Sequence, residues 1–212
     1  MKPAIFSNSV LVFLAVFLLP LTPNVFAQDK TLELAKSYEA DGMYEKALSL
    51  YEKSYKADSN NLVILDRLKN IYKILGKNDS RLAIILRQVG SDSLNIVLLC
   101  ELMDAYIRTK HAGEAEAVIA QGIRLNPQSV ITYRLLAGTL NENRMFDLAE
   151  KVYTWGRKNT GNEKLFVIEM ANLYGYRGDV FSAVKEYLKY YHAEANAMDY
   201  VRSQILKFPD NE

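Results

Sequence analysis

The fold is decided by residues 96–129, IVLLCELMDAYIRTKHAGEAEAVIAQGIRLNPQS. In the first half of this stretch, apolar residues recur at three- and four-residue spacing, which is typical of one face of a helix. These residues are Ile96, Leu99, Leu102, Met103 and Tyr106. A second apolar stripe follows a short turn and consists of Ala115, Val118, Ile119 and Ile123. Asn126-Pro127 ends the segment because proline cannot continue a helix. The stretch therefore predicts two helices joined by a turn.

The same pattern recurs along the chain at a fixed period. Segments that begin at Gln28, Leu62, Ile96, Val130 and Lys164 align without insertions. One column is mostly tyrosine and holds Tyr38, Tyr72, Tyr106, Leu140 and Tyr174. A second column, further along each segment, is mostly alanine and holds Ala47, Arg81, Ala115, Ala149 and Ala183. Helices of about 12–14 residues are marginal in water, so each pair must bury its stripes against its neighbours. The period therefore predicts a stacked all-α array.

These columns resemble the tetratricopeptide repeat, a helix pair with a period of about 34 residues. Its leucine-small pair is matched by Leu34-Ala35, Leu136-Ala137 and Met170-Ala171. Tyr38, Ala47 and Tyr51 continue the pattern in the first unit, and Pro127 supplies the terminal proline in the third. The resemblance covers residues 28–197. It implies a right-handed α-solenoid of about five helix-turn-helix repeats plus a C-terminal capping helix.

The second unit departs most from the pattern. Lys69 and Arg81 stand where the other units favour small residues, and Asp92-Ser93 stands where a terminal proline is expected. We therefore expect the two helices of this unit to cross more loosely than those of the fourth.

The predicted organisation follows from this register. A signal peptide at 1–27 precedes five repeats, at 28–61, 62–95, 96–129, 130–163 and 164–197, and a helix and tail at 198–212. In this last segment Val201, Ile205 and Phe208 recur at helical spacing and resemble the first helix of a sixth unit. We expect a capping helix that covers the open end of the stack and presents a polar face to solvent. The alternative is an array that continues in a longer protein.

The N-terminal residues have the features of a cleavable export signal. Lys2 precedes an unbroken apolar run at residues 10–19, VLVFLAVFLL, which Pro20 and Pro23 end. Val25-Phe26-Ala27 has the small-x-small pattern that signal peptidase requires, so we expect the mature chain to begin at Gln28. The alternative is a signal anchor, although the run is short for a membrane span. Cleavage predicts a periplasmic or extracellular protein of the bacterial envelope, with no membrane span in the mature chain.

Composition narrows the classes of partner. Lys2 is the only charged residue before Gln28, so 25 basic residues balance 25 acidic ones in the rest of the chain. No polybasic run occurs, which disfavours nucleic acid or an anionic membrane as the partner. Cys100 is the only cysteine and has no partner for an internal disulfide.

The sequence contains no catalytic pattern. It lacks a glycine-rich phosphate loop, a Gly-x-Ser-x-Gly elbow and a His-Glu-x-x-His helix. Two histidines and one cysteine are too few for a metal site at known spacings. We therefore expect a protein that is not an enzyme and that uses no cofactor or metal.

The tetratricopeptide resemblance implies a concave groove lined by the first helix of each pair. In this chain the groove columns hold Asp66, Asn70 and Lys73 in the second unit and Cys100, Asp104 and Arg108 in the third. They continue with Arg134, Asn141 and Glu142 in the fourth unit and with Asn172 and Tyr176 in the fifth. This mixed polar lining suits a protein or peptide segment. The alternative for each residue is that it lies on an ordinary solvated helix face and binds no partner.

We therefore expect an exported, non-enzymatic interaction scaffold that binds a protein or peptide segment in this groove. Two alternatives remain. The solenoid could self-associate as a structural part of an envelope assembly, or it could be the adaptor portion of a longer enzyme or secretion component.

Overall fold

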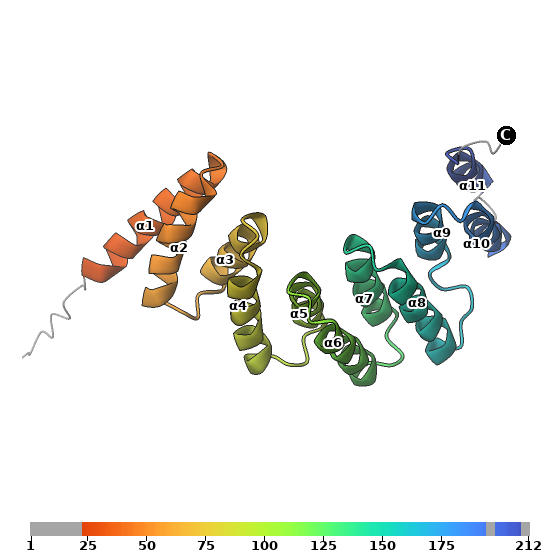
Figure 1. Ribbon diagram of the computed structural model, residues 1–212, viewed down its shortest axis with the longest axis horizontal. Helices are drawn as coiled ribbons and strands as arrows, with labels where there is room; N and C mark the ends of the chain where they lie inside the picture. The colour runs from red at the N-terminus through yellow and green to blue at the C-terminus, as the bar shows by residue number, and fades with distance from the viewer. Residues whose placement is uncertain (1–22, 194–197, 209–212) are drawn as a thin grey trace, which may run out of the picture. The chain divides into compact units, whose positions relative to one another are not determined.

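The computed structural model describes residues 23–193 and 198–208, and the regular elements among them are all α-helices (Figure 1). These residues belong to two compact units, which are divided between Ala57 and Asp58. The predicted signal segment falls largely on residues 1–22, which lie outside the described residues.

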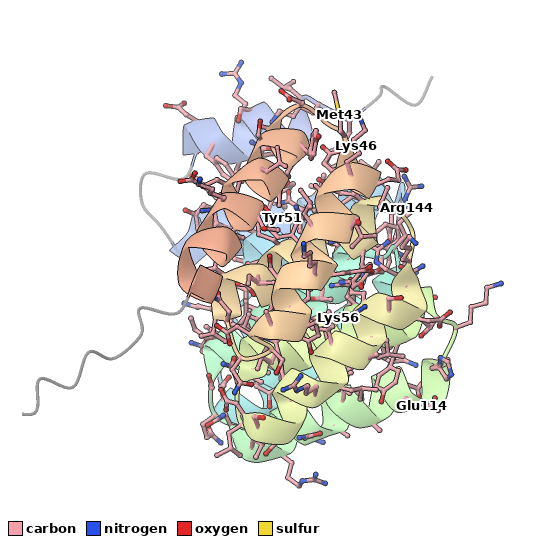
Figure 2. All side chains as sticks on the ribbon, turned by 90° about the vertical axis from the view of Figure 1, so that its left-hand side faces the viewer. Met43, Lys46, Tyr51, Lys56, Glu114 and Arg144 are labelled. Atoms are coloured by element: carbon pink, nitrogen blue, oxygen red, sulfur yellow. The ribbon has the colours of Figure 1, made fainter. Side chains whose placement is uncertain are left out.

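The first unit is the helix pair α1 (Pro23–Ala40) and α2 (Tyr44–Ala57). α1 begins at Pro23, before the predicted first repeat, because proline is tolerated at the first helical position, where its missing N–H needs no partner. Figure 2 shows Tyr51 between the two helices and Met43 and Lys46 near the turn that joins them. Tyr51 is fully buried, and its hydroxyl donates to Glu39 Oε2 at 2.7 Å.

The second unit contains four further helix pairs and a last helix. The pairs are α3 (Leu62–Ile74) with α4 (Asn78–Ser91), α5 (Ile96–Arg108) with α6 (Ala112–Leu125), α7 (Val130–Glu142) with α8 (Phe146–Thr160), and α9 (Val167–Tyr176) with α10 (Val180–Ala193). The last helix is α11 (Met198–Ile205). The structure thus confirms the predicted all-helical array of paired helices.

The period of the sequence recurs in the helix ends. The second helices begin at Tyr44, Asn78, Ala112, Phe146 and Val180, so each begins one repeat length after the one before it. Three first helices are capped in the same way, by Asn61, Asn95 and Ser129, whose side-chain oxygens accept backbone N–H groups of the first turn. Local side-chain capping therefore sets where α3, α5 and α7 start.

The turn within each pair repeats as well. One residue in each of the five turns has a positive φ: Gly42, Gly76, Lys110, Arg144 and Gly178, with φ between 59° and 77°. Glycine adopts this left-handed conformation without strain, whereas lysine and arginine do not. The third and fourth turns therefore carry a conformational cost that the other three avoid.

The core of the second unit is densest between α5 and α8. Leu99, Met103, Tyr133, Leu136 and Leu140 are all fully buried there. Gly156 lies at a tight crossing, where an added Cβ would be 2.7 Å from a carbon of Phe166 and 2.8 Å from Cγ of Tyr133. The absence of a side chain at Gly156 therefore lets the fourth and fifth repeats approach closely.

The fifth repeat starts differently from the prediction. α9 begins at Val167, after the predicted start at Lys164, and no side chain caps it. Phe166 is buried with φ 58° and packs its ring against Tyr153, with ring centroids 5.1 Å apart. The chain stays non-helical here because burying Phe166 between neighbouring repeats outweighs one turn of helix without a cap.

The segment after residue 197 forms the predicted helix. Val201 of α11 is buried with Ala171 and Tyr187, and Ile205 and Phe208 pack against the same cluster. Its apolar face therefore covers the fifth repeat.

The second repeat shows the expected looser crossing. α3 and α4 contact each other less closely than the helices of any other pair among the described residues. Lys69 and Arg81 are both buried, and their charged ends reach acidic groups of α5. The second pair is thus tied to the third repeat by charged groups.

Candidate partner-binding groove

Three of the predicted groove residues lie together on α3. Asp66, Asn70 and Lys73 line one pocket of about 330 Å³. Lys69 and Arg81 of the same repeat and Glu101 of α5 complete the lining. All of these lining residues are polar or charged, and both signs of charge are present.

Lys69 organises this pocket. Its Nζ lies 3.0 Å from Asp66 Oδ1 and 2.8 Å from Glu101 Oε2, so one ammonium group joins α3 to α5. The Asp66 side chain remains 70% exposed and is open to a partner. Because Lys69 is buried, the two carboxylates are held in place by a group that moves little.

Asp104, another predicted groove residue, is only 4% exposed. Its carboxylate accepts hydrogen bonds from Arg81 Nη1, from Arg108 Nε at 2.9 Å and from Asn143 Nδ2 at 2.9 Å. Burial by itself raises the pKa of Asp104, but the hydrogen bonds from Asn143 and Arg81 and the nearby positive charges outweigh it and lower the pKa. Asp104 is therefore ionised and joins α4, α5 and the end of α7, and Arg108 stays exposed beside it.

Cys100 is the second predicted lining residue that the structure buries. Burial raises the pKa of its thiol to about 11, which Glu101 and Glu142 reinforce and a hydrogen bond with Thr139 opposes. The thiol is therefore protonated at neutral pH and behaves as a small packing group.

The predicted residues of the fourth and fifth repeats are mostly at the surface. Exposed Arg134 pairs with Glu169 at 2.7 Å, and Glu142 is also exposed. Asn141 is half-buried, and its Oδ1 has no hydrogen-bond partner. Asn172 is exposed and accepts a hydrogen bond from the Tyr187 hydroxyl at 2.7 Å. Tyr176 is largely exposed and stacks on Phe146, with ring centroids 6.4 Å apart.

A second buried ion pair links the fourth and fifth repeats. Arg157 of α8 donates to both carboxylate oxygens of Glu186 on α10, at 3.1 and 2.8 Å, and its Nε donates to the carbonyl of Leu165. Burial favours a higher pKa for Glu186, but hydrogen bonds from Arg157 and Lys189 and their charges lower it. This pair fixes the irregular chain before α9.

Sequence reasoning missed an apolar surface on the same helices. Val63, Val97 and Ile131 each follow the first residue of a first helix, one repeat apart, and all three are more than half exposed. A pocket of about 640 Å³ lies beside Val97, between α3, α4 and α5. The period itself marks this column, but periodicity does not distinguish an exposed apolar position from a buried one.

Within residues 23–193 and 198–208, no group of three or more histidine, cysteine, aspartate or glutamate residues is arranged to hold a metal ion. Among the same residues, none of the helices combines the length and apolar character that a membrane span needs.

Comparison with known proteins supports the fold. No protein-family model and no curated protein matches the chain. The solved structure of MamA has a TM-score of 0.51 at 20% identity and covers 82% of this chain and 94% of that one. A MamA RS-1 double mutant has a TM-score of 0.51 at 13% identity, over 84% and 96% of the two chains. TTC0263 of Thermus thermophilus, described as a thermophilic TPR protein, has a TM-score of 0.48 at 19% identity, over 84% and 97%.

At these identities the likeness concerns the fold alone. With the repeating register of the helix ends, it shows that the fold is an α-solenoid of helix-turn-helix repeats.

Proposed function

We propose that this chain is an exported, non-enzymatic interaction scaffold of the bacterial envelope that binds a protein or peptide segment along its first helices. One observation carries the proposal. Asp66, Asn70 and Lys73, which the tetratricopeptide resemblance assigns to a binding groove, line one pocket together with Lys69 and Glu101.

The physical character of this surface suits a peptide. Asp66 and Glu101 offer acceptors, Lys73 offers a donor, and Asn70 offers both, so the pocket matches the alternating donors and acceptors of a polypeptide backbone. Lys69 pairs with the carboxylates of Asp66 and Glu101, so these two acceptors lose less side-chain entropy on binding than unpaired ones would. Repeat arrays use such extended surfaces for recognition.

The groove is tested by a paired substitution. Asn70→Ala with Lys73→Ala removes two exposed side chains of the pocket, and we expect a partner captured from envelope extracts to bind at least several-fold more weakly. Glu116→Ala, an exposed change on α6, serves as the control and should leave binding unchanged. Equal binding by the wild type, the paired variant and the control would rule out this pocket as the binding surface.

Export rests on the apolar run at residues 10–19 and the Val25-Phe26-Ala27 pattern. We expect mass spectrometry of the protein from envelope fractions to find Gln28 as the first residue. A chain that keeps Met1 in those fractions would support the signal anchor instead.

Self-association is a second candidate, favoured by large apolar side chains exposed near the C-terminal end. Tyr176, Phe181 and Leu206 are 78%, 80% and 73% exposed. If they form a self-interface, sedimentation velocity should show a concentration-dependent dimer that Phe181→Ser abolishes. A monomer at all concentrations would exclude this alternative.

A further inference from the structure

One column of the repeat lies where a second helix meets both its own first helix and the next repeat. It holds Ser54, Gln88, Gly122, Gly156 and Tyr190, one from each repeat. At Gly122 an added Cβ would lie 3.1 Å from Ile96 Cδ1 and 3.3 Å from Leu136 Cδ1. Glycine therefore allows Ile96 to close over α6. In the second repeat the same position carries the large polar side chain of Gln88.

The surroundings of Gln88 are correspondingly more open. Leu62, which occupies the column of Ile96, is 68% exposed. The backbones of α3 and α5 also approach each other at fewer places than those of α5 and α7. The pocket of about 640 Å³ lies at this place, with Gln88, Leu62, Leu65, Val97 and Leu98 among its walls.

The pocket combines apolar walls with an unused acceptor. Leu62, Leu65 and Leu98 present apolar side chains to it. The Oε1 atom of Gln88 is buried and has no hydrogen-bond partner. A buried acceptor without a donor is costly unless a ligand or water satisfies it, so Gln88 favours an occupant that brings an N–H group.

The rim of the pocket favours a cation. Three carboxylates, of Asp66, Asp92 and Glu101, line it together with two basic side chains. The ammonium group of Lys69 is shared by Asp66 and Glu101. The guanidinium of Arg87 donates to Ser59 Oγ at 2.9 Å and to Asn60 Oδ1 at 3.2 Å. The carboxylates thus outnumber the basic groups. Asp66 and Asp92 are exposed and can accept hydrogen bonds from a bound ligand.

We propose that this pocket selects a peptide segment in which an apolar residue is followed or preceded by lysine or arginine. The apolar side chain packs against Leu62, Leu65 and Leu98, a backbone N–H donates to Gln88 Oε1, and the basic side chain reaches Asp66 or Asp92. This inference rests on the proposed scaffold function and adds the chemistry of its partner.

An array of immobilised octapeptides tests the selection. Each peptide carries one pair of adjacent residues in a glycine-serine frame, and the array is probed with the purified full chain. We expect pairs of an apolar residue with lysine or arginine to bind about fivefold better than pairs with aspartate or glutamate, the ratio typical of one favourable charge contact. Equal binding of the two sets, or a preference for acidic pairs, overturns the proposal.

Three substitutions test whether the pocket is the source of this peptide preference. Gln88→Gly introduces the residue of the third and fourth repeats, lets Leu62 close over α4, and should abolish the preference. Leu62→Ser changes an exposed side chain outside the core and should lower selection for the apolar residue. Asp66→Lys should shift the preferred neighbour from basic to acidic, a change that loss of folding does not produce.

Gln88→Gly introduces a glycine into a helix, which by itself weakens the helix. Ala117→Gly, at an exposed position of α6, is the control for this effect and should keep the full preference. Melting curves identify any variant that fails to fold. If Gln88→Gly and Leu62→Ser are folded and keep the preference, the pocket is not its source and the inference fails. If the array shows no preference while Asn70→Ala with Lys73→Ala still weakens partner binding, the selectivity proposal fails and the scaffold proposal stands.

Discussion

The second and fourth repeats share one length and one register, but different forces hold them. In the fourth repeat, Ala137 and Ala149 are fully buried and the two helices pack through apolar groups. In the second, the same columns hold Lys69 and Arg81, whose buried charges pair with Glu101 and Asp104 of the third repeat. The array thus tolerates replacement of apolar packing within a repeat by ionic contact between repeats.

The difference has an energetic consequence. A buried ion pair adds little net stability over apolar packing, but removing one of its partners leaves an uncompensated charge. The second repeat therefore depends on acidic groups of the third, whereas apolar contacts hold α7 and α8 together directly. Lys69 lines both pockets beside α3, and Arg81 lines the smaller one.

The largest expected effect comes from removing a buried carboxylate that joins the second repeat to the third. Asp104→Ala removes the acceptor of Arg81, Arg108 and Asn143, and we expect it to lower the free energy of unfolding by about 3–5 kcal/mol. Arg81→Ala should cost less, because Asp104 keeps two donors. Urea denaturation of both variants measures the difference, and a larger loss for Arg81→Ala would refute this account of the network.

The substitution Leu136→Ala in α7 tests the apolar packing of the fourth repeat. Leu136 is fully buried, so the change should cost about 2–5 kcal/mol through lost apolar burial and a cavity. Leu135→Ala, the more exposed neighbouring position, is the matched control and should cost far less. Similar losses at both positions would contradict the assigned packing face of α7.

Acid should act on the ionic contacts more than on the apolar ones. Because the pKa values of Asp104 and Glu186 are lowered in the folded protein, the unfolded chain binds more protons as pH falls. Their stabilisation is complete above about pH 5, and it is lost as pH falls through the folded pKa values. Asp104→Asn should therefore reduce the dependence of unfolding free energy on pH below about 5, whereas Leu136→Ala should not. Parallel pH profiles for wild type and Asp104→Asn would show that Asp104 does not contribute.

The smallest effect tests the turns. Lys110→Gly and Arg144→Gly relieve a left-handed backbone conformation and should each stabilise the chain by about 0.5–1 kcal/mol. Gly178→Ala, at the equivalent turn of the fifth repeat, should destabilise by a similar amount. The denaturant midpoint measures all three, and a loss of stability in both glycine variants would show that strain is absent from these turns.

Much of the fold was predictable because its signals are local. The apolar spacing of residues 96–129 predicted two helices joined by a turn, and the structure contains them as α5 and α6. The late start of α9 was not predictable, because it follows from burial of Phe166 against Tyr153 of another repeat. Periodicity carries no information about such a contact between repeats.

The candidate site was predictable only in part. The tetratricopeptide resemblance implied Asp66, Asn70 and Lys73, which share a pocket, but it also implied Asp104, which is buried. Arg81 and Asp104 lie on different repeats, and their pairing depends on how α4 packs against α5. The sequence alone showed that Arg81 broke a packing column and did not show what satisfied its charge.

Apart from the start of α9, the sequence by itself determined where the helices start, where they turn and how often the unit repeats, because caps, glycines and apolar spacing act over a few residues. Only the tertiary structure decided which polar side chains are buried and which face solvent, and where the pockets lie. Burial depends on the distance between helices that are far apart in the chain, and that distance is set by side chains such as Gln88 and Lys69 together with the neighbours they meet.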